Sequence, residues 1–160
     1  MLSATLIFSG TFFSTFIEPP KAKCRRLKVD NLAPYMLKLS RDRVTDENAE
    51  VILLDPEHEV LNYPNKITAK DFEGWTQERG LYFPGEWDNN FTPILSLNDN
   101  GESPKEGSLL ITKHGKGHYI YTGLSFFRQF PEGVSGAYRL FANMLSIGKE
   151  NITIKPKLED

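Results

Sequence analysis

The stretch from Gly107 to Ile147 constrains the fold of this chain more than any other part of the sequence. Apolar residues run or alternate from Ser108 to Thr112 and again from His118 to Thr122, on either side of the turn His114-Gly115-Lys116-Gly117. Two such runs around a glycine-rich turn predict a β-hairpin. The segment that follows, SFFRQFPEG, has the composition of an exposed loop.

A helix is expected directly after this loop. Its apolar residues recur at spacings of three and four, which places them on one helical face. Ser135 is expected to cap the start, and Gly148 to end the helix, because glycine readily adopts a left-handed backbone. The apolar stripe consists of Ala137, Leu140, Phe141, Met144 and Leu145. The order strand, turn, strand, loop, helix predicts the closing unit of an α/β sheet domain.

Shorter elements are predicted in the first two thirds of the chain. Extended segments are expected at Pro34 to Leu39, Glu50 to Leu54, Trp75 to Phe83 and Phe91 to Leu97; helical turns after Thr45 and Thr68; and loops at Asp55 to Asn65 and Pro84 to Asn90. These signals favour a three-layer α/β fold with a mainly parallel sheet and an antiparallel hairpin near its C-terminal end.

Composition limits the possible partners. The chain has 160 residues, of which 39% are hydrophobic and 25% charged, as in an ordinary domain with a core. Its net charge is -2, and its Lys and Arg residues are dispersed among acids, which argues against a nucleic-acid partner. Cys24 is the only cysteine, so an internal disulfide is impossible and no cysteine-based metal site is expected.

The N-terminal segment from Leu2 to Ile17 is apolar and uncharged but short for a membrane span. It is compatible with an export signal, with a buried strand pair that turns at Ser9-Gly10-Thr11, or with a start that is not native to the domain. A signal would make the protein extracytoplasmic, periplasmic or secreted, and otherwise it is expected to be cytoplasmic. Membrane contact is expected nowhere else. The expected division is 1–30 for this segment and a linker, 31–148 for the domain, and 149–160 for a charged tail.

The segment before the hairpin is rich in charged residues of the types that often form binding or catalytic sites. Glu78 and Arg79 are neighbours and, on a strand, point to opposite faces, so one of them must be buried, paired or lining a pocket. Arg128 in the SFFRQF loop is the expected partner of Glu78 or of Asp71. This pattern indicates either an ion-paired loop anchor or a polar pocket for a sugar or carboxylate.

The pocket interpretation gives roles to aromatic residues as well. Trp75 would form the floor, and Phe126 and Phe127 would form the walls. The candidate ligand-binding residues are Asp71, Trp75, Glu78, Arg79, Phe127 and Arg128.

His58 is a weaker catalytic candidate. It follows the strand expected at Glu50 to Leu54, and loops after strands often build sites in α/β sheets. Glu57 or Glu59 could orient His58 as a base, and a plain surface turn is the other interpretation. His114 and His118 lack a third ligand, so no metal is expected. The Gly115-Lys116-Gly117 turn is not a phosphate-binding loop, and no cofactor is expected.

Two long segments carry a family resemblance. NKITAKDFEGWTQERGLYFPGEWD and GKGHYIYTGLSFFRQFPEGVSGAYRLFANMLS resemble the C-terminal region of large bacterial PIG-L (LmbE-like) deacetylases. That region is similar to a class I glutamine-amidotransferase-like, flavodoxin-like domain. The resemblance spans Leu32 to Gly148 and implies a three-layer sandwich that is incomplete at its N-terminus. Its first strands are missing or replaced by residues 1–30, so the chain is expected to be a fragment or a shortened paralogue.

The chemistry of these families is not implied for this chain. The His-Pro-Asp-Asp zinc motif of the deacetylases is absent, and so is the cysteine nucleophile with a late His-x-Glu of the amidotransferases. The resemblance therefore implies a non-catalytic accessory or ligand-binding domain associated with carbohydrate (N-acetylglucosaminyl) deacetylases. Its expected partners are a carbohydrate and a deacetylase domain or subunit. The alternatives are a small hydrolase that uses His58 with an acidic partner and a structural interaction domain.

Overall fold

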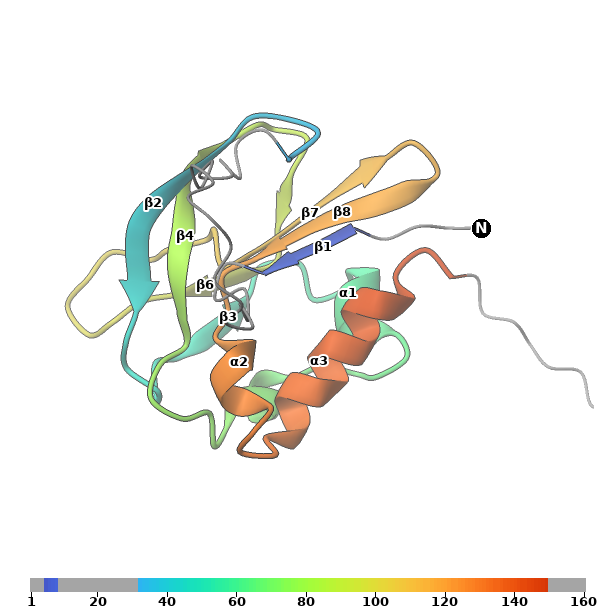
Figure 1. Ribbon diagram of the computed structural model, residues 1–160. Helices are drawn as coiled ribbons and strands as arrows, with labels where there is room; N and C mark the ends of the chain where they lie inside the picture. Colours follow the sequence, from blue (N-terminus) through green and yellow to red (C-terminus); the bar gives the residue numbers. More distant parts are fainter. Residues whose placement is uncertain (1–4, 9–31, 150–160) are drawn as a thin grey trace, which may run out of the picture.

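The computed structural model describes residues 5–8, by backbone alone, and residues 32–149. These residues form a mixed α/β fold of small sheets and short helices (Figure 1). The elements are β1 (Thr5–Phe8), β2 (Leu37–Val44), β3 (Val51–Leu53), α1 (Glu59–Asn62), the 3-10 helix η2 (Ala69–Phe72), β4 (Gly80–Trp87), β5 (Thr92–Pro93), β6 (Leu95–Leu97), β7 (Leu109–His114), β8 (Gly117–Thr122), α2 (Phe126–Gln129) and α3 (Ser135–Ser146). The turn expected at Ser9-Gly10-Thr11, Cys24 and the tail after 149 lie outside the described residues.

The predicted hairpin is confirmed and forms the centre of the largest sheet. Strands β7 and β8 pair antiparallel from Leu109 opposite Thr122 to His114 opposite Gly117. The turn between them contains Gly115 at φ +57°, a backbone angle that glycine tolerates without strain. The sheet order is β1-β8-β7-β5, with β1 parallel to β8.

The expectation of a mainly parallel sheet is wrong for the described strands. Within residues 5–8 and 32–149, only β1 and β8 are parallel neighbours, whereas β2–β4, β3–β6, β5–β7 and β7–β8 are antiparallel. Parallel neighbours need a long crossover connection, usually through a helix. Between β7 and β8 the chain has only a tight turn, which fixes the antiparallel direction.

The central sheet is covered by different elements on its two faces. On one face, Ile111 and Ile120 join a core that includes Leu140 and Met144 of α3. On the other face, a second core brings sheet residues against the strand pair β2–β4. That core contains Leu110, Tyr119 and Tyr121 of the sheet, Leu37 of β2, and the partly buried Trp87 of β4. Helices thus cover one face and a β-ribbon the other (Figure 1).

The β2–β4 ribbon differs from the sequence expectation. Both strands have eight residues, and β4 continues through Pro84, where a turn was expected. Proline removes a hydrogen-bond donor and is tolerated where a ladder is irregular, and the register shifts on either side of the Leu39–Pro84 pair. Thr45 begins no helical turn; its backbone N–H and hydroxyl donate to the Asp99 carboxylate at 2.8 and 2.9 Å.

The helical elements agree more closely with the sequence. Thr68 precedes η2, and the Asp71 carboxylate accepts the Thr68 backbone N–H at 2.8 Å. Helix α3 starts where expected, but Ser135 is its first residue rather than its cap. Gly148 follows it with φ +74°. The expected loop at residues 55–65 contains the short helix α1.

Candidate functional site

The predicted ion pair between Arg128 and the segment before β4 is confirmed. Arg128 Nε lies 2.5 Å from Glu78 Oε1. The Arg128 side chain is 33% exposed and the Glu78 side chain 12% exposed, and the guanidinium also lies over the Phe127 ring at 4.9 Å. The pair ties α2 to the chain entering β4, as a loop anchor does.

Asp71 and Arg79 have partners of their own. The Asp71 carboxylate accepts from Arg139 Nε at 2.7 Å rather than from Arg128. Arg79 is buried, and its Nε and Nη2 donate to the Ala49 carbonyl at 3.1 and 2.9 Å. Its Nη1 donates to the carbonyl of Phe72. Burial lowers the pKa of Arg79, while Asp46 and Glu47 act in the opposite direction.

Trp75 lies in the core and not on the floor of an open pocket. Its side chain is 3% exposed, its ring centroid lies 5.7 Å from that of Phe126, and its Nε1 donates to the Asp71 carbonyl at 3.0 Å. Phe126 is also buried, whereas Phe127 is 40% exposed. The expected floor and one expected wall therefore pack against each other, because burying large rings stabilises the fold. Ligand binding by the remaining candidates stays a prediction.

His58 caps a helix. Its Nδ1 accepts the backbone N–H of Val60 at 3.1 Å at the start of α1. Glu59, one of its expected acidic partners, accepts the backbone N–H of Gly148 at 2.9 Å instead. Desolvation lowers the pKa of His58, opposed by Asp55 and Glu59 and reinforced by His118. Among the described residues, no group of three or more His, Cys, Asp or Glu side chains is placed to hold a metal ion.

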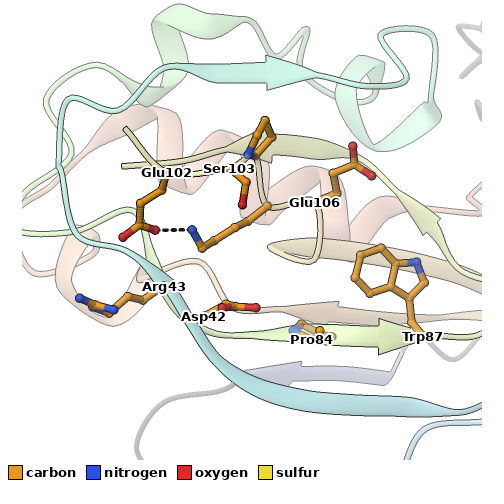
Figure 2. A pocket seen from close by; sticks show the side chains of 10 residues that line it. Asp42, Arg43, Pro84, Trp87, Glu102, Ser103 and Glu106 are labelled. Carbon is orange, nitrogen blue, oxygen red and sulfur yellow. Dashed lines mark hydrogen bonds and ion pairs between the residues drawn. The ribbon is translucent and has the colours of Figure 1, made fainter. Parts of the chain in front are cut away.

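A cleft that the sequence did not predict lies between the β2–β4 ribbon and the loop of residues 102–106 (Figure 2). Its volume is about 440 Å³. The lining is mostly polar and charged, with one large aromatic ring. The lining residues are Asp42, Arg43, Pro84, Gly85, Trp87, Glu102, Ser103, Pro104, Lys105 and Glu106. The sequence signal was obscured because residues 84–90 and 98–107 both have the composition of plain turns.

A β-bulge places Asp42 along the cleft. Asp42 pairs with Phe83, whereas Leu39 pairs with Pro84, so two residues of β2 have no cross-strand partner at this point. Ser40 holds the irregularity, because its hydroxyl donates to the Phe83 carbonyl at 2.7 Å and accepts the Asp42 N–H at 2.8 Å. Bulges commonly redirect a side chain in this way.

The opposite wall is fixed by the backbone. Lys105 and Leu97 exchange two backbone hydrogen bonds, of 3.1 and 3.0 Å, which hold the loop to β6. At Gly107 the chain runs so close to β4 that a Cβ atom would lie 2.6 Å from the Pro84 carbonyl oxygen. A glycine is needed for this approach. One wall of the cleft is therefore a strand pair, and the other is a loop held to strand β6 by two backbone hydrogen bonds.

The charges of the cleft are only partly paired. Lys105 forms an ion pair with Glu102, and its side chain is 14% exposed. Asp42, Arg43 and Glu106 are exposed and have no ion pair with any described residue. Figure 2 shows the Trp87 ring standing above β4 at one end of the cleft. This combination of a ring face with several hydrogen-bonding groups is chemically suited to a ligand that is both hydroxylated and partly apolar.

Comparison with known proteins adds no assignment: no family model, curated protein or solved structure matches this chain. Within the described residues, no helix has the length and apolar character required to cross a membrane.

Proposed function

We propose that this chain is a non-catalytic accessory domain that binds carbohydrate, and that the cleft beside the β2–β4 ribbon is its binding site. The observation that carries the proposal is the presence of Trp87 and several hydrogen-bonding side chains in one cleft of about 440 Å³. Sugars present an apolar ring face that stacks on aromatic rings, and hydroxyl groups that pair with carboxylate and ammonium groups.

The family resemblance supports this proposal at the level of architecture. We propose that residues 32–148 are a shortened form of the flavodoxin-like, glutamine-amidotransferase-like domain of PIG-L-type deacetylases. The parallel strand β1 beside β8 and the hairpin followed by α3 are compatible with such a sheet. The β2–β4 ribbon would then occupy the face where that fold carries helices. A deacetylase domain or subunit is the proposed partner.

Tryptophan fluorescence tests the binding proposal directly. The chain has two tryptophans: Trp75 is buried in the core, and Trp87 lines the cleft. Titration with the N-acetylglucosamine trimer, the glucosamine trimer and a glucose trimer is expected to change the emission with at least one of them. Trp87→Phe keeps an apolar ring in the second core and retains the Trp75 signal, and it is expected to lose the response.

Calorimetry on the same samples detects binding that leaves the tryptophan emission unchanged. If none of the three saccharides gives a heat of binding or a change in emission, the proposed function is wrong. If the emission of Trp87→Phe changes with saccharide as much as that of the parent, the saccharide binds elsewhere than in the cleft.

The two other functions have less support. A hydrolase would need His58 to be oriented by an acid through Nδ1, and that atom accepts the Val60 N–H instead. A purely structural domain gives no role to an open polar cleft whose charges on Asp42, Arg43 and Glu106 form no ion pair with the described residues.

A further inference from the structure

The charges along the cleft do not cancel, and this bears on which saccharide it takes. Its lining has three carboxylates, on Asp42, Glu102 and Glu106, against two cations, on Arg43 and Lys105. Glu102 and Lys105 neutralise each other in their ion pair. Among the described residues of the lining, this leaves Asp42 and Glu106 with Arg43 as the one unpaired cation.

The remaining cation is displaced from the aromatic end of the cleft. Figure 2 shows Arg43 and Glu102 toward one end, and Trp87 with Glu106 toward the other. Opposite charges that are far apart and exposed are screened from each other by solvent and salt. A ligand that extends along the cleft from Trp87 therefore meets Glu106 first and then Asp42, and reaches Arg43 only at the far end (Figure 2).

We propose that the cleft selects an amine-bearing saccharide, whose sugar ring stacks on Trp87 and whose ammonium groups are bound by Asp42 and Glu106, two carboxylates without an ion pair to any described residue. This inference rests on the proposed function and narrows it. An ammonium group donates charge-assisted hydrogen bonds, which are roughly twice as strong as neutral ones. A neutral saccharide offers these carboxylates only uncharged hydroxyl and amide donors, which form weaker hydrogen bonds than an ammonium group does.

Two features argue against an anionic saccharide. Lys105 is already paired with Glu102, so a carboxylate or phosphate of the ligand would compete with Glu102 for its ammonium group. The Ser40 hydroxyl accepts the backbone N–H of Asp42 and so fixes the Asp42 backbone beside the cleft, which keeps a carboxylate close to any anionic ligand bound there. Like charges placed together weaken binding and exclude the wrong partner.

The test compares the glucosamine trimer with the N-acetylglucosamine trimer on the full chain by fluorescence and calorimetry, at mildly acidic pH and low salt. These trimers have the same backbone and differ in whether the nitrogen is charged. The glucosamine trimer is expected to bind about tenfold more tightly, and added salt should reduce this preference.

Charge-removing variants show which side chains cause the preference for the glucosamine trimer. Asp42→Asn and Glu106→Gln are each expected to reduce the preference for the amine about threefold, and the double variant to abolish it. Arg43→Gln should increase it, because it removes the opposing cation. Glu86→Gln is the matched control: Glu86 is an exposed carboxylate on β4, next to Trp87, but it pairs with Lys38 and does not line the cleft, so the preference should not change.

The outcomes separate this inference from the proposed function. Equal or tighter binding of the N-acetylated trimer would overturn the amine preference while leaving carbohydrate binding intact. The same holds if the amine preference survives in the double variant at an unchanged melting temperature. If neither trimer binds, both proposals fall.

Discussion

Single residues show most clearly how buried charge is compensated in this chain. Arg128 is one third exposed, whereas its partner Glu78 is nearly buried. Arg128→Ala would leave the Glu78 carboxylate without its cation, and we expect a loss of about 1–3 kcal/mol in the free energy of unfolding. Arg128→Lys should restore only part of this, because lysine lacks the planar guanidinium.

Chemical denaturation of these variants measures the effect. Lys38→Ala serves as the control, because Lys38 and Glu86 form an exposed pair and its loss should cost about 0–1 kcal/mol. If Arg128→Ala and Lys38→Ala have the same denaturation midpoint, Arg128 does not anchor the loop.

The second prediction for a single residue concerns His58 and the pH dependence of the free energy of unfolding. Its pKa is lowered in the folded chain, chiefly by desolvation. The unfolded chain therefore binds the proton more readily, so the stabilising effect of neutral His58 is complete above about pH 6.5 and declines as the pH falls below that value. His58→Asn keeps a capping side chain and should remove this pH dependence, whereas His58→Ala should cost about 1 kcal/mol at neutral pH.

Thermal denaturation across this pH range checks the prediction for His58. If the stability of the parent and that of His58→Asn depend on pH in the same way, the prediction is wrong. The His58 imidazole would then have the same pKa in the folded and the unfolded chain. Glu59→Gln tests the same pH dependence in the other direction: it removes a carboxylate that opposes the lowering of the His58 pKa, so the loss of stability at low pH should become larger.

At the residue scale, the sequence identified which charges need compensation but not always what compensates them. The adjacency of Glu78 and Arg79 predicted a pair with Arg128, and that pair forms. Arg79 is instead satisfied by carbonyls of Ala49 and Phe72, from segments that no local pattern brings together. Asp42 was likewise missed, because its position depends on a cross-strand bulge.

At the scale of elements, Gly136 in α3 gives a prediction that opposes helix propensity. Alanine is normally the better helix former by about 1 kcal/mol. However, a Cβ at position 136 would lie 1.8 Å from the backbone carbonyl oxygen of Asp71 in η2. Because backbone atoms cannot turn aside, Gly136→Ala is expected to destabilise by about 2 kcal/mol or more through forced separation of the two elements.

Ser135→Ala is the matched control on the same helix. Ser135 is exposed and is the first helical residue rather than the cap, so its change should stay within about 0.5 kcal/mol. Guanidine denaturation of both variants decides the matter. A Gly136→Ala variant as stable as its parent would mean that α3 and η2 separate without cost.

Elements specified by local signals were predicted, and elements specified by distant partners were not. The β7–β8 hairpin and α3 follow from apolar periodicity and from glycines such as Gly148. Strand β4 was expected to end before Pro84, because proline and glycine usually mark turns. It continues because β2 pairs with it through register shifts, which a single strand's sequence does not display.

For the whole molecule, the arrangement of layers could not be derived from composition. The fold is mixed α/β as expected, but the second face of the sheet is covered by β2–β4. The reason is that apolar side chains lie on both faces of β7 and β8, and their pattern shows that both faces are buried without showing which element covers each. The proposed cleft depends on this ribbon.

The N-terminal strand makes the prediction at this scale. The apolar run from Leu2 to Ile17 has no amphipathic period. If this segment is not native to the domain, deletion of residues 1–28 is expected to leave stability nearly unchanged, and if it supplies core strands, the deletion is expected to lower the melting temperature. In the structure, Thr5 to Phe8 pair with Tyr119 to Thr122 of β8. Deletion of residues 1–28 would turn β8 into an edge strand with unpaired backbone groups, which favours association with other chains.

We therefore expect the deletion to lower the free energy of unfolding by about 2–4 kcal/mol, since each lost backbone hydrogen bond contributes about 0.5–1.5 kcal/mol. It should also increase self-association, measured by light scattering. In the full chain, the double change Leu6→Pro and Ile7→Pro should reproduce the loss by removing donors from β1. Deletion of residues 150–160, which removes no described element, is the control. If both N-terminal variants keep the melting temperature of the parent, the prediction is wrong and residues 1–30 lie outside the folded domain. The reason is that losing a strand that pairs with β8 should lower the free energy of unfolding.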